Sequence, residues 1–199
     1  MQIRRKGDIF SVKASLQREI LKELALAEPK TKREIMQLVH GHYSNTWKAV
    51  DSLVKQGLIQ QVRIKEWKNR KYPQFWLTDK GLLVCLALNL ITSPEKTVWR
   101  IKQIYPEKAM LFEYVLRVSP YLNREVFRIT YENINRKGNL NVKDLMQILL
   151  VQAFSDSDMG KLQKLIETAK EYPEFYAMFK KEFSNFKETL EKIAEIVLS

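Results

Sequence analysis

The sequence predicts a mainly α protein in two parts: three helices followed by a two-stranded β-hairpin, and then an all-helical C-terminal half. Between about residues 58 and 77 the apolar residues change from helical spacing to strand-like alternation, whereas the residues after Thr92 keep a helical pattern. The positive charge is also uneven. Residues 1–92 hold 17 Lys and Arg against 8 Asp and Glu, while residues 93–199 hold 17 against 15. We therefore expect one domain over residues 1–92 and a second over residues 93–199.

The first two helices are predicted by apolar spacing and by an N-terminal cap. The first runs from Ser11 to Glu28, because the residue before Pro29 disfavours helical backbone. The second begins at Thr31, which has the spacing of a capping box with Glu34. In that arrangement the threonine hydroxyl accepts a hydrogen bond from the Glu34 backbone, and the glutamate carboxylate accepts one from the Thr31 backbone.

A third helix is expected between Ser44 and Gly57. Ser44 is a candidate N-cap, and Gly57 is a candidate left-handed residue at the C-terminal end. The residues expected to face the core recur at helical spacing and are Thr46, Val50, Leu53 and Val54.

The hairpin is predicted by two apolar, alternating segments on either side of a basic turn from Lys68 to Lys71. Pro73 lies in the returning segment and has no backbone N–H, so we expect that strand to be an edge strand. Thr78 then caps a fourth helix that continues to about Leu90.

The C-terminal half is divided by turn residues into five or six helices. The boundaries fall at Pro94, Pro106, Pro120, residues 137–139, residues 155–158 and Pro173, and Asn141 is a candidate N-cap. The last helix carries apolar residues at steps of three or four, namely Phe175, Phe179, Phe183, Phe186, Leu190, Ile193 and Val197. Such a stripe fits an internal core, a dimer seam or a ligand pocket, and the pattern alone leaves these three open.

The order of elements in the N-terminal half resembles the winged helix-turn-helix superfamily, especially prokaryotic transcriptional regulators of the MarR, ArsR and PadR kinds. The resemblance covers about residues 8–90 and is carried by three features: KTKREIMQLV over residues 30–39, the spacing from Ser44 to Gly57, and WLTDKG over residues 76–81. It implies that the third helix is a recognition helix for the DNA major groove, and that the hairpin is a wing on the backbone or minor groove. The resemblance does not extend to the half after Thr92.

The start of such a recognition helix meets the base edges. Ser44 is expected to contact a phosphate, Asn45 an adenine, and Lys48 a guanine or a phosphate. Trp47 has two readings, a contact with a sugar or thymine methyl group and a cover over part of the core.

Basic residues outside the third helix are expected to bind phosphates, which adds affinity without sequence information. They lie around the hairpin turn and at the start of the second helix, and they are Lys65, Lys68, Arg70, Lys71, Lys32 and Arg33.

The predicted function is that of a sequence-specific regulator of transcription that binds double-stranded DNA. We expect a homodimer formed through the C-terminal helices, because one small module reads few base pairs and two half-sites are commonly read together. A small-molecule effector stays open. The alternative is a winged-helix protein-interaction module of a chromosome-maintenance, replication or transcription assembly, since one fold serves both roles.

Other classes of function have little support in the sequence. It contains no glycine-rich phosphate loop, nucleophile elbow or paired-cysteine motif, so we expect no enzyme and no cofactor. His40 and His42, and likewise Asp156 and Asp158, lack the further ligands that a metal site needs. The apolar run over residues 82–91 is too short to cross a membrane, and the single cysteine, Cys85, fits a reducing compartment; we expect a cytoplasmic protein.

Overall fold

The computed structural model describes residues 8–137 and 159–198. They form a mainly helical protein with one small antiparallel sheet of three strands in the order β1-β3-β2. The chain divides into two compact units, residues 1–104 and residues 105–199. The boundary between the two units therefore lies after Ile104, twelve residues beyond the domain boundary at Thr92 that was expected from the sequence.

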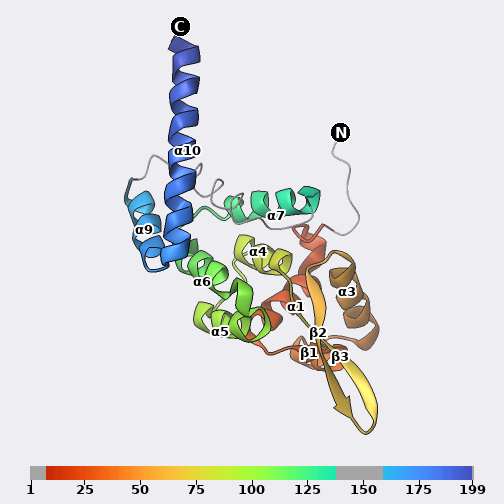
Figure 1. Cartoon of the computed structure of the whole chain (residues 1–199). Coiled ribbons are helices and arrows are strands. Elements are labelled where there is room, and N and C mark those ends of the chain that lie inside the picture. The colour runs from red at the N-terminus through yellow and green to blue at the C-terminus, as the bar shows by residue number, and fades with distance from the viewer. Residues whose placement is uncertain (1–7, 138–158, 199) are drawn as a thin grey trace. The chain divides into compact units, whose positions relative to one another are not determined.

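The first unit contains six helical segments and all three strands of the described chain. In chain order these are η1 (Val12–Ala14), α1 (Ser15–Leu26), β1 (Lys30–Thr31), α2 (Lys32–Leu38), α3 (Tyr43–Lys55), β2 (Ile59–Trp67), β3 (Arg70–Leu77), α4 (Asp79–Ala87) and α5 (Pro94–Ile104). The β2–β3 hairpin projects beyond the helices of this unit, with its turn at the far end (Figure 1).

The predicted local caps are confirmed. Thr31 and Glu34 form a complete capping box at the start of α2. Thr78 caps α4, because its Oγ1 accepts a hydrogen bond from the Gly81 amide at 3.1 Å. Gly57 has a φ of 67°, the left-handed conformation expected after α3. These signals depend on neighbours three or four residues apart, so the sequence alone is enough to identify them.

The predicted N-cap of α3 is wrong. The helix begins at Tyr43 and its N-cap is His42, so Ser44 lies inside the first turn. His42 forms no side-chain capping hydrogen bond, so the N-cap carries no sequence signal of the kind that Ser44 offered. Of the residues expected to face the core, Thr46, Val50 and Leu53 are buried, but Val54 is exposed.

The position predicted for β3 is also wrong, because β3 lies between β1 and β2 instead of at an edge. Strand β1, which the sequence analysis did not predict, pairs only with Gln74 and Phe75 of β3. Pro73 lies next to these two residues, past the end of β1, and its partner in β2 is Ile64. Over most of its length β3 therefore has one neighbouring strand, which explains how a residue without an N–H fits in it.

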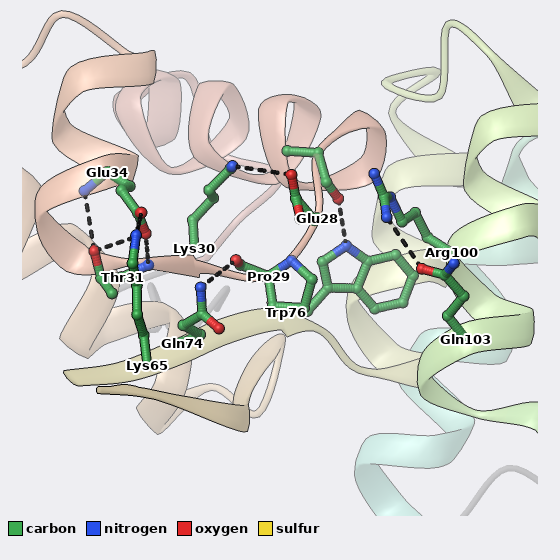
Figure 2. A network of polar contacts seen from close by, with 11 residues as sticks. Glu28, Pro29, Lys30, Thr31, Glu34, Lys65, Gln74, Trp76, Arg100 and Gln103 are labelled. Atoms are coloured by element: carbon green, nitrogen blue, oxygen red, sulfur yellow. Dashed lines mark hydrogen bonds and ion pairs between the residues drawn. The ribbon is translucent and has the colours of Figure 1, made fainter. Parts of the chain in front are cut away.

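Side chains from distant segments complete the C-terminal end of α1. The last carbonyl groups of a helix have no hydrogen-bond donor within the helix, so they need donors from elsewhere. Thr97 of α5 donates its hydroxyl proton to the Ala25 carbonyl at 2.9 Å, and the buried Trp76 indole donates to the Ala27 carbonyl at 3.1 Å. Figure 2 shows Trp76 beside Gln74, whose amide donates to the Pro29 carbonyl at 2.9 Å.

The start of α4 packs closely against Leu58, which lies between α3 and β2. A Cβ atom added to Gly81 would lie 2.0 Å from the Leu58 carbonyl oxygen, so only glycine fits there without a shift of the backbone. The Leu58 carbonyl also accepts a hydrogen bond from the Thr78 amide at 3.0 Å. The WLTDKG segment is thus fixed by a cap and by a close backbone contact.

The described part of the second unit is helical. It consists of η2 (Pro106–Lys108), α6 (Ala109–Val118), η3 (Ser119–Tyr121), α7 (Glu125–Lys137), α9 (Met159–Lys170) and α10 (Pro173–Leu198). The buried Tyr114 of α6 donates its hydroxyl proton to the Leu165 carbonyl of α9 at 3.3 Å. Arg117 binds both carboxylate oxygens of Glu171, and this hydrogen bonding raises the pKa of the guanidinium.

Part of the sequence-based description of this half lies outside the described residues. This applies to the Asn141 cap and the turn at residues 155–158, and to the side chains of Phe175, Phe186, Leu190, Ile193 and Val197. Within the described part of the stripe, Phe179 is buried and Phe183 is half-buried.

Candidate nucleic-acid interface

Helix α3 presents a row of exposed polar side chains opposite its buried face. Thr46, Ala49, Val50 and Leu53 point into the first unit and are buried. Residues on the other side recur every three or four positions, which places them one above another along the helix. The exposed row is Ser44, Lys48, Asp51 and Lys55, with Asn45 exposed beside it in the first turn.

An aromatic pair lies along one flank of this row. The rings of Tyr43 and Trp47 stack with their centroids 4.1 Å apart and their planes at 24°. Tyr43 is 61% exposed and Trp47 is half-buried. The Trp47 ring is therefore covered on one side by Tyr43 and remains at the surface next to the polar row, where its contact with DNA stays a prediction.

Lys32 joins the start of α2 to this face of α3. Its ammonium group forms an ion pair with Asp51 and lies 5.7 Å from the Trp47 ring centroid. Asp51 is the single acid in the exposed row of α3. Since Lys32 offsets this negative charge, Lys32 itself is not a free cation for a further partner.

The β2–β3 hairpin closes with a two-residue turn at Lys68 and Asn69. Both residues have positive φ, 48° and 59°, as a type I′ turn requires. Trp67 and Arg70 face each other across the strands immediately before and after the turn. The turn thus holds Lys68 and Arg70 at the exposed end of the hairpin.

Strand alternation separates the side chains of the hairpin onto two faces, because paired residues on neighbouring strands share a face. The pairs Arg63 with Gln74, Lys65 with Tyr72 and Trp67 with Arg70 lie on one face. The pairs Ile64 with Pro73 and Glu66 with Lys71 lie on the other. The first face carries cations and aromatic rings. The second face carries two apolar residues, Ile64 and Pro73, and an ion pair between Lys71 and Glu66 at 3.7 Å.

Glu34 connects the hairpin to α2 (Figure 2). Its carboxylate accepts hydrogen bonds from the Thr31 amide at 2.8 Å and the Thr31 hydroxyl at 2.9 Å, and one from the Lys65 ammonium at 2.6 Å. Burial alone would raise the pKa of Glu34, but the hydrogen bonds and the Lys65 charge outweigh it and lower the pKa to about 2. Glu34 is therefore ionised at neutral pH and holds Lys65 against the start of α2.

The predicted basic residues thus fall into two groups. Lys32, Lys65 and Lys71 each pair with an acid. Arg33, Lys48, Lys68 and Arg70 are exposed and form no ion pair among residues 8–137 and 159–198. Two further exposed cations have no acidic partner in that part of the chain and were not predicted from the sequence, Lys55 and Arg63. Their spacing was a usable signal, since Lys55 follows Lys48 by two helical turns and Arg63 alternates with Lys65 along a strand.

Within the described residues, no group of three or more His, Cys, Asp and Glu side chains could hold a metal ion. His40 and His42 are both exposed, in the turn between α2 and α3. No helix in the described part of the chain combines the length and the apolar character needed to cross a membrane.

Comparisons with protein-family models, with curated proteins and with solved structures found no match to this chain.

Proposed function

We propose that the first unit is a winged helix-turn-helix module that binds double-stranded DNA, and that the chain is a sequence-specific regulator of transcription. Helix α3 would enter the major groove, and the β2–β3 hairpin would lie along the backbone or the minor groove. One observation carries the proposal: five exposed cations without acidic partners among the described residues lie on the two elements that this docking would bring to DNA. They are Lys48 and Lys55 on α3, and Arg63, Lys68 and Arg70 on the hairpin.

In this proposal the exposed row of α3 reads the bases. Asn45 has the paired donor and acceptor that match adenine, and Lys48 donates to guanine or to a phosphate. Ser44 and Lys55 contact the backbone from the two ends of the row. Arg33 at the start of α2 reaches the opposite strand.

The ion-paired lysines have a different role. Lys32 neutralises Asp51, so that no uncompensated anion on α3 faces the phosphates. Lys65 fixes the hairpin to α2 through Glu34. These residues support the geometry of the surface, and they contribute less than the unpaired cations to phosphate binding.

The second unit is proposed to make the protein a homodimer in the cytoplasm, with α10 as the main contact. Two DNA-binding modules would then read two half-sites. The proposal rests on the 26-residue length of α10 and on the apolar stripe in its sequence. We propose no enzymatic activity and no cofactor, and an effector ligand stays open.

Binding to a random-sequence duplex, measured by fluorescence anisotropy in a series of salt concentrations, tests the proposal. If the six cations assigned to DNA, namely Arg33, Lys48, Lys55, Arg63, Lys68 and Arg70, all contact phosphate, the logarithm of affinity falls with a slope of about −5 against the logarithm of salt concentration, roughly a thousandfold loss between 50 and 200 mM. The double variant Arg63→Ala/Arg70→Ala should flatten that slope by about 2. The matched control is Lys22→Ala/Lys96→Ala, which removes the same charge from exposed sites on α1 and α5.

The alternative, a protein-interaction module, is favoured by one observation. Ile64 is 54% exposed and Trp67 is 55% exposed, and both lie on the hairpin. Absence of duplex binding at low salt would reject the DNA proposal and make this alternative the leading one. An equal loss in the Lys22→Ala/Lys96→Ala control would also reject the proposed docking, because binding would then depend on total charge alone.

A further inference from the structure

The end of the hairpin carries an exposed tryptophan that the proposed duplex contacts do not use. We call residues 67–70 the hairpin tip. Trp67 is 55% exposed, and Arg70 is its partner across the strands. The ammonium group of Lys68 lies 4.7 Å from the Trp67 ring centroid. The tip therefore combines one indole ring with two cations that have no acidic partner in the described chain.

The turn itself does not require a tryptophan. Type I′ turns depend on residues that accept positive φ, here Lys68 and Asn69, and not on the residues beside them. Trp67 is also not a core residue, in contrast to Trp76, which is fully buried. Leaving an indole more than half in water forgoes the stabilisation that burial of its apolar surface would supply.

The surroundings of Trp67 match the chemistry of an unpaired nucleotide. An aromatic face stacks on a nucleobase of any sequence, and adjacent cations bind the phosphates on either side of it. Arg63, Lys65 and Tyr72 lie on the same face of the hairpin as Trp67 and Arg70. The two cross-strand pairs nearest the tip on this face thus each place a basic residue opposite an aromatic ring, Arg70 with Trp67 and Lys65 with Tyr72.

A fully paired duplex offers little to this ring, because both faces of each internal base are already covered by its neighbours. We propose that the hairpin tip binds unpaired bases of single-stranded DNA next to a duplex, with Trp67 stacked on a base and with Lys68 and Arg70 on the flanking phosphates. The inference rests on the proposed binding of duplex DNA by α3. It adds a preference for a duplex that has an unpaired segment at one end.

The test compares three labelled DNAs by fluorescence anisotropy: a blunt duplex, the same duplex with a single-stranded tail at one end, and the tail sequence alone. The wild-type chain should bind the tailed duplex more tightly than the blunt one. Trp67→Ala should bind the tailed duplex roughly tenfold more weakly than the wild type does, which is the effect of one stacked base. Its affinity for the blunt duplex should not change. Trp67→Phe should keep most of the preference, because phenylalanine also stacks.

Trp99→Ala is the matched control, since Trp99 is another exposed tryptophan of the first unit and also lies beside a cation, Arg100. Quenching of tryptophan fluorescence by the tailed duplex should be smaller in Trp67→Phe than in the wild type, which reports the stacked ring directly. Circular dichroism of each variant checks that the fold is retained.

The outcomes separate this inference from the proposed function. Equal wild-type affinity for blunt and tailed duplexes would overturn the stacking role and leave duplex binding intact. A tail preference that survives in Trp67→Ala would also overturn it. Binding to none of the three DNAs would reject both proposals together.

Discussion

Glu34 offers a sharp test of how the hairpin is held, because one carboxylate both caps α2 and anchors Lys65. Replacing it by glutamine, Glu34→Gln, keeps the size of the side chain but removes its charge and replaces one of its two acceptor oxygens by an NH2 group, which can only donate. The hydrogen bonds from Thr31 and Lys65 would then lose their charged acceptor, which makes such bonds weaker. The expected result is a less stable first unit at neutral pH.

The magnitude follows from the pKa of Glu34, which is lowered from 4.5 to about 2. A difference of that size corresponds to roughly 3 kcal/mol of stabilisation of the ionised form in the folded state. The Lys65 side chain is half exposed, so solvent screening reduces this figure, and we expect a cost of about 1–2 kcal/mol. Because the folded pKa lies below the unfolded one, this stabilisation is complete above about pH 4.5 and disappears as the pH falls towards 2.

The assay is urea unfolding at pH 7, 5 and 3, followed by tryptophan fluorescence. The four tryptophans, residues 47, 67, 76 and 99, all lie in the first unit, so the signal reports on that unit alone. Glu19→Gln is the control, because Glu19 is exposed on α1 and should change stability by less than about 0.5 kcal/mol. A Glu34→Gln cost below about 0.5 kcal/mol, or one that is equal at pH 7 and pH 3, would refute the reasoning.

Four further measurements follow from the charges and burial described above. Lys48→Ala should lower the ratio of specific to non-specific DNA affinity by roughly tenfold, measured on a site selected from a random library; an unchanged ratio would remove Lys48 from base reading. Arg70→Ala should flatten the salt dependence of duplex binding by about 0.9, and Lys71→Ala by less than half of that, because Lys71 lies on the other face beside Glu66; equal effects would contradict this assignment. Glu34→Gln should steepen the same slope by up to about 0.9, since it releases Lys65, and a slope equal to that of Glu19→Gln would contradict the release. Cys85 is fully buried, which raises the pKa of its thiol, so a thiol reagent should modify it only as fast as the unit unfolds; rapid modification of the folded chain would show that the site opens.

The sequence was sufficient where a structure depends on residues close together in the chain. The caps at Thr31 and Thr78 and the left-handed Gly57 were all predicted, because each follows from contacts within three or four positions. The mainly helical character was predicted for the same reason, since helical periodicity is local.

The errors arose where the outcome depends on distant segments. Strand β1 has two residues, and its conformation is set by pairing with Gln74 and Phe75, more than forty positions away. That pairing also makes β3 a central strand and explains the wrong placement of Pro73. The start of α3 was misplaced because its N-cap, His42, forms no side-chain capping hydrogen bond, so the usual capping signal is absent there.

The candidate site shows the same division. The basic residues could be located from the sequence, but their pairing could not. Lys32 with Asp51 and Lys65 with Glu34 are separated by 19 and 31 positions, so only the fold brings them together. A count of positive charge therefore overstates the number of cations available to a polyanion.

The link between Thr97 and the end of α1 determines where the first unit can be cut. A fragment ending at Thr92 would lack the hydroxyl that satisfies the Ala25 carbonyl, and it would expose the core site that Ile101 fills. A buried carbonyl without a donor and a missing core side chain each cost on the order of 1–5 kcal/mol, a large part of the stability of a small domain. A fragment that carries this unit alone should therefore include α5 and end at Ile104 or later.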